Sequence, residues 1–255
     1  MPEREETKRS CLPTVHREED GIAVYRYGMT DSTNLRAKQA AAQGVTRGLF
    51  IAEGQSAGRG RLGRSFYSPE DTGLYFSCLY TTHEPLHSFL ALTPAAAVVC
   101  ARVIEKHCGK KVGIKWVNDL YYEEKKVCGI LVESVGALDV QSKLIVGVGI
   151  NLHTEEFPPE LAGIAGSLGV RIDRQAMALE IYRALEGYVC DPADRSFMEE
   201  YTARSVVLGK RVKLLKGEEC FFGTVLGFDG DGGIVLNADG ERLVFHGGEI
   251  TLRLQ

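Results

Sequence analysis

The chain has 255 residues, of which 44% are hydrophobic, so it can bury a sizeable core and form more than one folding unit. Its formal net charge of −4 gives no global basic field that would attract nucleic acid, and any anion site must therefore be local. No apolar run approaches the ~20 residues of a membrane helix, and the first ten residues, MPEREETKRS, lack the apolar stretch of a secretory signal. The seven cysteines form no CxxC pair, which argues against a disulfide framework or a zinc site and favours reduced thiols in the cytoplasm.

The N-terminal part of the chain combines a polar tail with a short helix. Residues 1–20 are polar and charged, and we expect a flexible tail there. The stretch DSTNLRAKQAAAQG predicts a helix, with Asp31 or Ser32 as its N-cap and Gly44 as its stop.

A longer helix and several strands are expected in the middle of the chain. TPAAAVVCARVIEKH predicts a helix over 93–107, with Thr93 at the N-cap, Pro94 in the first turn and Gly109 just past the end. We expect strands at 48–55, 72–81, 112–122, 126–135 and 143–152. The strands at 112–122 and 126–135 are predicted to form a hairpin around the turn EEK.

The last third of the chain changes character near Ser205. A helix is predicted to begin near Asp173, and a short helix is predicted within 195–204. Beyond Ser205, apolar runs of strand length alternate with Gly and Asp turns. We therefore predict two folded units, a larger one over 21–204 and a small β-barrel over 205–255.

The segment AGRGRLGR, called the arginine loop below (residues 57–64), holds three arginines and three glycines. Arginine keeps its charge at neutral pH and offers a planar fork of donors that suits phosphate or carboxylate. The glycines let backbone N–H groups approach an anion closely. Their GxGxxG spacing is followed by no helical pattern, so the loop matches neither the P-loop nor the dinucleotide-binding fingerprint. The residues are Arg59, Arg61, Arg64, Gly58, Gly60 and Gly63.

Three further stretches carry residues suited to binding. KWVNDLYY combines a cation, an aromatic face, an amide and a carboxylate, at Lys115, Trp116, Asn118 and Asp119. In KKVCGILVES, Gly129 inside a strand indicates that something approaches the backbone closely. Strict alternation places Lys126 and Gly129 on opposite faces, so both line one pocket only if the strand bends. In VGVGIN, Gly147 and Gly149 share one face and would leave a shallow floor; packing against a helix explains them equally well.

In this order, DSTN, GRGRLGR, KWVNDL, KVCGILVE and GVGIN resemble the catalytic domain of biotin protein ligases. The resemblance runs from Asp31 to Asn151 and resumes in GGEITLR near the C-terminus. It implies an α/β (α+β) fold, a mixed sheet with helices related to class II aminoacyl-tRNA synthetases, followed by a small SH3-like barrel. Two features depart from the family. Val117 replaces the usual proline, and the 30 residues before Asp31 are too few for the DNA-binding domain of members that repress transcription.

The resemblance implies a two-step reaction. Biotin and ATP, with Mg²⁺ on the phosphates, form biotinyl-5′-AMP, which a lysine of a biotin carboxyl carrier protein domain then attacks. Arg59, Arg61 and Lys126 would be catalytic, because cations offset the repulsion between the biotin carboxylate and the α-phosphate. Asp119 would steer the incoming lysine or a metal, and no set of metal ligands is assigned. The implied biotin-binding residues are Ser32, Thr33, Asn34, Gln55, Gly58, Arg59, Gly60, Arg61, Lys126, Gly129, Gly147 and Gly149. The implied residues for ATP or the adenylate are Arg61, Arg64, Trp116, Asn118, Asp119 and Asn151.

Water would destroy the acyl-adenylate, so we expect the arginine loop to be mobile without ligand and to close over this intermediate. The expected compartment is the cytoplasm, with no nucleic-acid or membrane partner. Family members often pair through the catalytic sheet, so the resemblance allows a homodimer.

Three alternatives stay open at this point. A lipoate–protein ligase would run the same chemistry on a different acid. A non-catalytic sensor of biotin or its adenylate would bind ligand without labelling a carrier, although a sensor has no need to retain the cations. A nucleic-acid-binding module in the C-terminal barrel is disfavoured by acidic turns such as GFDGDGG.

Overall fold

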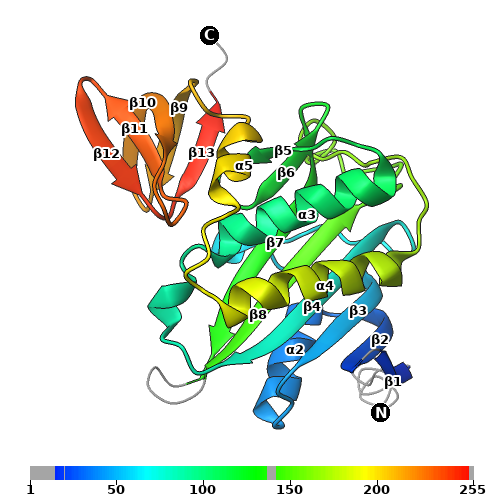
Figure 1. Cartoon of the computed structure of the whole chain (residues 1–255). Coiled ribbons are helices and arrows are strands. Elements are labelled where there is room, and N and C mark those ends of the chain that lie inside the picture. The colour runs from blue at the N-terminus through cyan, green and yellow to red at the C-terminus, as the bar shows by residue number, and fades with distance from the viewer. Residues whose placement is uncertain (1–14, 20, 137–141, 253–255) are drawn as a thin grey trace.

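The structure is a computed structural model that describes residues 15–19, 21–136 and 142–252. Its larger part is built on an eight-stranded mixed sheet (Figure 1). The strands are β1 (Val15–Glu19), β2 (Ile22–Thr30), β3 (Gly48–Gln55), β4 (Gly73–Thr82), β5 (Gly113–Lys115), β6 (Asp119–Tyr122), β7 (Lys125–Val135) and β8 (Ser142–Asn151). Their order in the sheet is β1-β2-β3-β4-β8-β7-β6-β5. The mixed α+β architecture expected from the sequence is therefore confirmed.

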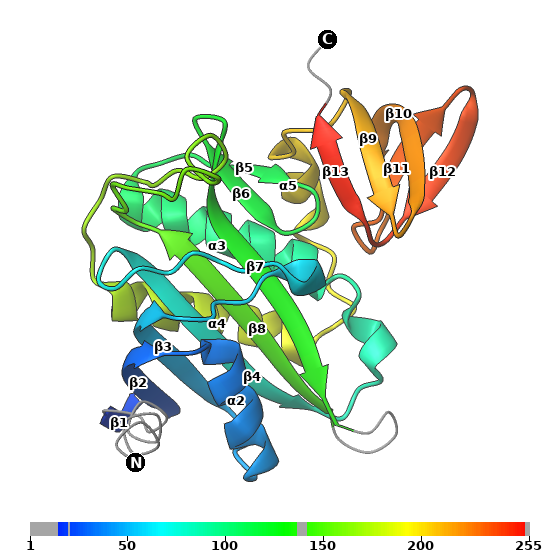
Figure 2. The same cartoon turned by 180° about the vertical axis from the view of Figure 1, so that it is seen from behind.

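Helices cover both faces of this sheet. Helices α3 (Leu92–Cys108) and α4 (Arg174–Cys190) pack on one face (Figure 1). Helix α2 (Thr33–Ala42) lies on the opposite face, where the arginine loop also crosses the sheet (Figure 2). Helix α2 connects β2 to β3, and these two strands pair in parallel because a crossover helix returns the chain to the same end of the sheet. The central strands β4 and β8 are buried along nearly their whole length because both faces are covered.

The predicted helix ends agree with the structure in part. The N-cap of helix α3 is Ala91, two residues before the expected Thr93, but the helix ends as predicted at Gly109, whose φ of 64° is left-handed. The α2 N-cap is Ser32, which makes no side-chain capping bond; its backbone N–H is bound by the carboxylate of Asp31 at 2.6 Å. Helix α4 is capped by Asp173.

The predicted hairpin over 112–122 and 126–135 is wrong in its first half. That half is two strands, β5 and β6, because the chain turns at Trp116–Asn118 and β5 pairs back on β6. Strands β6 and β7 do form a hairpin, but their register shifts between Leu120 and Tyr121. The shift leaves an extra residue, Val127, on β7. This bulge supplies the bend that lets Lys126 and Gly129 line one pocket.

Part of the segment 1–20, where a flexible tail was expected, is a strand in the structure. Val15–Glu19 form β1, which pairs antiparallel with β2 at the edge of the large sheet. The segment VHREE has one apolar residue, Val15, and so offers no apolar pattern by which to find this strand. Residues 1–14 and residue 20 lie outside the described residues.

The C-terminal β module is a five-stranded antiparallel sheet beside α5 (Met198–Ala203), as Figures 1 and 2 show. Its strands, in the order β12-β11-β10-β9-β13, are β9 (Arg211–Lys216), β10 (Glu219–Phe228), β11 (Ile234–Ala238), β12 (Glu241–Phe245) and β13 (Glu249–Leu252). It contacts the rest of the chain through Tyr201, whose ring packs edge to face on Phe228 with the ring centroids 5.1 Å apart. The indole Nε1 of Trp116 also donates to the Gly232 carbonyl at 2.8 Å. Val206 still pairs with Ile114 of β5, so pairing with the large sheet extends past residue 204. The assignment of the C-terminal β module as an SH3-like barrel stays a prediction.

The segment Leu86–Cys108 is long and apolar enough to cross a membrane. It contains α3, and 72% of its most apolar window is buried against the sheet and α4. The apolar surface of this segment is therefore accounted for by the protein core.

Candidate active site

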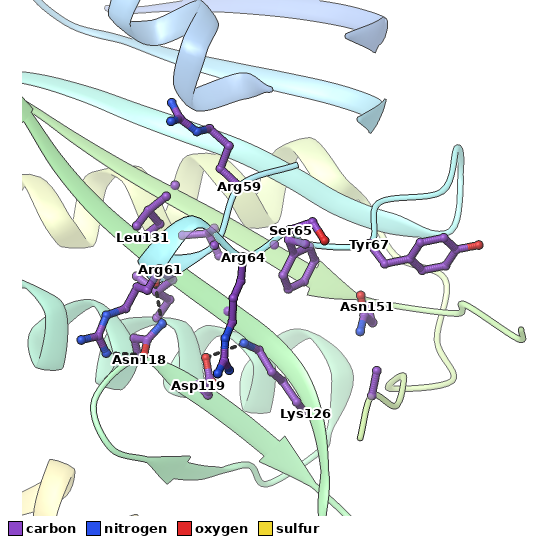
Figure 3. A pocket seen from close by; sticks show the side chains of 18 of the residues that line it. Arg59, Arg61, Arg64, Ser65, Tyr67, Asn118, Asp119, Lys126, Leu131 and Asn151 are labelled. Atoms are coloured by element: carbon purple, nitrogen blue, oxygen red, sulfur yellow. Dashed lines mark hydrogen bonds and ion pairs between the residues drawn. The ribbon is translucent and has the colours of Figure 1, made fainter. Parts of the chain in front are cut away.

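The arginine loop crosses β7 and β8 (Figure 2). A cavity of about 530 Å³ lies between the loop and these strands, and Figure 3 shows the side chains that line it. The structure thus gathers segments that are far apart in the sequence into one site. All of the predicted site residues except Gly58 line it, namely Ser32, Thr33, Asn34, Gln55, Arg59, Gly60, Arg61, Arg64, Trp116, Asn118, Asp119, Lys126, Gly129, Gly147, Gly149 and Asn151. Their individual roles stay predictions.

The glycines of the arginine loop allow its two arms to pack closely. A Cβ on Gly58 would lie 2.4 Å from the carbonyl oxygen of Phe66, whose N–H donates to the Gly58 carbonyl at 2.9 Å. At the tip, Leu62 and Gly63 have φ of 55° and 75°, which Gly63 adopts without strain. Gly58 therefore shapes the loop from behind the cavity wall.

One end of the cavity, called the cationic end below, gathers Arg61, Arg64, Lys115 and Lys126. Lys126 Nζ lies 2.6 Å from Asp119 Oδ1, and Arg61 Nη1 donates to Asn118 Oδ1 at 3.1 Å (Figure 3). The guanidinium of Arg64 pairs with Glu249 of β13. Each of these three cations therefore already has a partner that an incoming anion would have to replace or share.

Burial disfavours the charged form of two cations of the cationic end, Arg61 and Lys115. Burial lowers the pKa of Arg61, although the charges of Asp119 and Glu249 partly offset it. Burial also lowers the pKa of Lys115, which Asp119 again partly offsets. Poorly solvated cations interact strongly with an anion that enters the same cavity. The cationic end is therefore suited to phosphate and carboxylate groups.

The other end, called the neutral end below, is formed by uncharged polar side chains from β2–α2, β3 and β4. Gln55 Oε1 accepts from the N–H of Thr33 at 2.8 Å and from its hydroxyl at 3.2 Å. Gln55 Nε2 donates to Ser68 Oγ at 2.9 Å. Beneath them, the hydroxyl of Ser77 bonds to both Thr33 and Asn34. These bonds hold the polar groups in one arrangement before any ligand arrives.

The glycines of β7 and β8 leave room for side chains of the protein itself. A Cβ on Gly147 would lie 2.0 Å from Asn34 Oδ1, so Gly147 admits helix α2. A Cβ on Gly149 would lie 2.5 Å from the ring of Phe66, which also covers Gly129 at 3.1 Å. Of the two explanations offered by the sequence, helix packing holds for Gly147, and a floor beneath the loop holds for Gly149.

Two of the predicted residues, Arg59 and Asn151, lie away from the cationic end or are buried in the cavity wall. Arg59 points away from the cationic end and toward α2 (Figure 3), and its charge acts on Glu133 of β7. Asn151 is 3% exposed; its Nδ2 donates to the Gly166 carbonyl at 2.9 Å. Its Oδ1 is buried and has no hydrogen-bond partner among the described residues. Asn151 therefore offers a free acceptor to a ligand in the cavity.

Several lining residues were missed by sequence reasoning. Phe66 follows the arginine loop, and apolar residues of the segment 153–168 line the wall beyond β8. The stretch FPPELAGIAG could have indicated the residues of 153–168, because it places apolar residues in a Pro- and Gly-rich loop that forms no strand or helix. One of them, Ile164, is 55% exposed. The missed residues include Phe66, Phe157, Leu161, Ile164, Ala165, Gly248, Glu249 and Ile250.

Comparison with known proteins shows the family to which the chain is similar. The model of the Biotin/lipoate A/B protein ligase family matches residues 28–151, and that of the biotin protein ligase C terminal domain matches residues 207–253. The chain is 31% identical to the bifunctional ligase/repressor BirA of Escherichia coli over 242 residues, which cover 92% of this chain and 75% of that protein. The chain belongs to the biotin protein ligases.

Two further relatives cover the same region. The biotin–[acetyl-CoA-carboxylase] ligase of Mycobacterium tuberculosis is 29% identical over 234 residues, covering 87% of this chain and 86% of that protein. The structure of the Aquifex aeolicus biotin protein ligase in complex with biotin and ATP superposes with a TM-score of 0.76 at 31% identity, covering 91% of this chain and 99% of that one. The family resemblance inferred from the five motifs is therefore confirmed.

Proposed function

We propose that this biotin protein ligase joins biotin to ATP as biotinyl-5′-AMP and transfers the biotinyl group to a lysine of a biotin carboxyl carrier protein domain. The observation that carries the proposal is one cavity with a neutral end and a cationic end, in a chain similar to ligases named for this reaction. The Aquifex relative holds biotin and ATP together. The same pair of ligands suits a cavity divided in this way.

The two ends of the cavity suit the two parts of the acid. The bicyclic ring of biotin carries a polar, uncharged ureido edge, which fits the neutral end at Ser32, Thr33 and Gln55. Its carboxylate lies at the far end of an aliphatic chain and would reach Lys126. The ring of Phe66 over Gly149 gives that chain an apolar contact.

In the first step, two anions must approach each other. Arg61 and Lys126 would lie between the carboxylate and the α-phosphate and offset their repulsion, because fixed cations in a water-poor cavity need no reorganisation. Arg59 would act more weakly, since it points toward α2 and its charge acts on Glu133. Arg64, Lys115 and Asn118 would hold the remaining phosphate oxygens.

The adenine and ribose would lie toward Asn151 and Trp116. The free Oδ1 of Asn151 suits the exocyclic amine of adenine, a hydrogen-bond donor. Trp116 is held by its bond to Gly232, in the turn between β10 and β11, and would present a fixed aromatic edge. Apolar residues of 153–168, including Ile164, would cover the bound nucleotide.

Mg²⁺ would accompany ATP, and the cavity fits it as a phosphate-bound ion. Among the described residues, no group of three or more His, Cys, Asp or Glu side chains could hold a metal. Mg²⁺ commonly binds through substrate phosphates and one or two carboxylates, here Asp119 or Glu249. When bound, it would neutralise charge on the phosphates.

In the second step, Asp119, which now pairs with Lys126, would attract the ammonium of the carrier lysine. After this ammonium loses a proton to solvent, the neutral amine would attack the acyl carbon of the adenylate, and AMP would leave as the acyl–phosphate bond breaks. Closure of the arginine loop over the adenylate, a cytoplasmic location and pairing into a homodimer stay predictions.

The test is to incubate the purified chain with ATP, Mg²⁺, labelled biotin and a biotin carboxyl carrier domain. We expect biotin-dependent release of pyrophosphate and labelling of one carrier lysine. A parallel reaction with lipoate checks the acid. Release of pyrophosphate with lipoate but not with biotin would overturn the choice of acid, and adenylate formation without carrier labelling would identify a sensor.

A further inference from the structure

The hydrogen bonds beneath the neutral end terminate on a carboxylate that the site residues do not include. Glu133 of β7 accepts a hydrogen bond from Asn34 Nδ2 on Oε2 at 2.8 Å. Its other oxygen lies 2.6 Å from the Lys38 ammonium of α2. The Glu133 and Lys38 side chains are 22% and 25% exposed, so this pair is mostly shielded from water. Glu133 thus joins β7 to the helix that carries Thr33.

Glu133 is an acceptor at every pH at which the enzyme would work. Burial raises the pKa of its carboxyl, but the hydrogen bonds from Lys38 and Asn34 and the charges of Lys38 and Arg59 outweigh it, so its pKa lies below the usual value. An ionised carboxylate has no proton to donate. Asn34 must therefore direct its NH₂ group to Glu133 and its carbonyl oxygen away from it.

The direction of each further bond follows from this one. Asn34 Oδ1 faces Ser77, in the space that Gly147 leaves free. A serine hydroxyl has a single proton, and here it goes to Asn34 Oδ1. Ser77 Oγ also lies 2.8 Å from Thr33 Oγ1. Because the one proton of Ser77 is used on Asn34, Ser77 has only a lone pair to offer Thr33.

The opposite end of the network imposes the same direction. The Ser68 hydroxyl donates to the Phe66 carbonyl at 3.0 Å, so it accepts the bond from Gln55 Nε2. Gln55 Oε1 is therefore the atom that faces Thr33, and it too is an acceptor. The one proton of the Thr33 hydroxyl is engaged by Gln55 or Ser77, and only lone pairs remain for a ligand.

We propose that Glu133 is a positioning residue that, through Asn34 and Ser77, makes Thr33 a hydrogen-bond acceptor toward the cavity and so selects a ring that carries N–H donors. The inference rests on the proposed function, which brings the ureido ring of biotin to Thr33. It identifies the class of ring that the site accepts: a cyclic urea fits, while a ring with oxygen or sulfur at that position presents lone pairs to lone pairs.

The test begins with Glu133→Gln, which keeps the size of the side chain but lets it donate or accept. Asn34 then loses its fixed orientation. We expect KM for biotin to rise about tenfold, the effect of one weakened hydrogen bond, while kcat and KM for ATP change less than about twofold. The preference for biotin over an analogue with ring oxygen in place of the N–H group should fall by about the same factor.

A double variant tests direction separately from structure. In Asn34→Asp with Glu133→Gln, the Gln amide donates to the new carboxylate, which still accepts from Ser77, and the net charge is unchanged. We expect this variant to recover most of the biotin affinity lost in Glu133→Gln. Lys38→Met is the matched control: it removes the ion pair but leaves the carboxylate as acceptor, so KM for biotin should stay within about twofold of the unmodified enzyme.

An unchanged KM for biotin in Glu133→Gln would overturn the inference. So would a double variant no better than the single one, or a Lys38→Met enzyme as impaired as Glu133→Gln, since each would reduce Glu133 to an ion-pair partner. These outcomes are read in an enzyme whose unmodified form makes biotinyl-5′-AMP. Failure of the unmodified form to make it would instead count against the proposed function.

Discussion

The two ends of the cavity are held by different forces. At the neutral end, Gln55 bonds to Thr33, and Asn34 bonds to Ser77 and Glu133. At the cationic end, the charges are held by counter-ions: Lys126 by Asp119 and Arg64 by Glu249. A ligand can bind the first end without breaking any of its bonds. At the second end, a ligand must exchange partners with the cations.

This difference separates recognition from chemistry. A network whose donors and acceptors are already matched discriminates well, because a wrong ligand leaves a buried group unpaired. Cations that exchange a counter-ion for the bound ligand can then offset the charge of the reacting groups from fixed positions. We therefore expect changes at the neutral end to alter KM for biotin and changes at the cationic end to alter the rate of adenylate formation.

The largest effect is expected at the cationic end. Replacing Arg61 or Lys126 by Ala should slow adenylate formation about 10²–10³-fold, the usual loss when one fixed group that stabilises a developing charge is removed. Pyrophosphate release measures it, with circular dichroism to check folding. Arg59→Ala is the comparison, because Arg59 points toward α2, and its loss should stay below about tenfold. An equal loss at Arg59 and Arg61 would break the division between the ends.

The next effect is expected at the neutral end. In Gly147→Ala, the new methyl would lie 2.0 Å from Asn34 Oδ1 and must displace it. Overpacking of this kind costs about 1–3 kcal/mol, so KM for biotin should rise about 10- to 100-fold with KM for ATP unchanged. Gly187→Ala is the matched control: it lies in α4 with no atom within 4 Å of the added Cβ. A normal KM for biotin in Gly147→Ala would show that Asn34 does not need its present position.

A third prediction concerns the loop between the two ends. Leu62 and Arg64 of the arginine loop are 71% and 69% exposed, so a protease that cleaves after arginine should cut there. Biotin and ATP together, at about ten times their dissociation constants, should slow this cleavage about tenfold if the ligands hold the loop closed. Cleavage after Arg242, an exposed residue of β12, is the internal control. Equal protection at both positions would point to overall stabilisation rather than loop closure.

The motifs predicted most of the site because they carry chemistry that the core does not need. Charged and glycine-rich stretches such as the arginine loop are unlike core strands, and their order along the chain was enough to identify the family. Their convergence depends on sheet order: β8 lies between β4 and β7, which brings Gly149 under Phe66. Adjacency of this kind rests on pairing between distant segments, which local patterns do not encode.

The features that the sequence did not predict also depend on contacts between distant segments. Glu249 reaches the cavity from β13 of the C-terminal β module, and Ile164 from a loop with no regular pattern. The turn at Trp116–Asn118 divides a run that looks like one strand, because apolar residues on both sides hide it. The edge strand β1 has a polar sequence, since a strand at a sheet edge can be solvated on its outer side. Sequence patterns find buried faces, and these features depend on tertiary contacts instead.

The smallest effect is expected far from both ends, and it sets the scale for the others. Asp173 caps α4 by accepting from the N–H groups of Gln175 at 3.1 Å and Ala176 at 3.0 Å, on the face of the sheet away from the cavity. Asp173→Ala should lower the free energy of unfolding by about 1 kcal/mol and the melting temperature by roughly 2–4 °C, with both KM values unchanged. Calorimetry and steady-state kinetics measure these quantities. If KM for biotin rose here as it does in Gly147→Ala, the neutral end would be responding to overall stability, and the argument that its own hydrogen bonds fix its selectivity would fail.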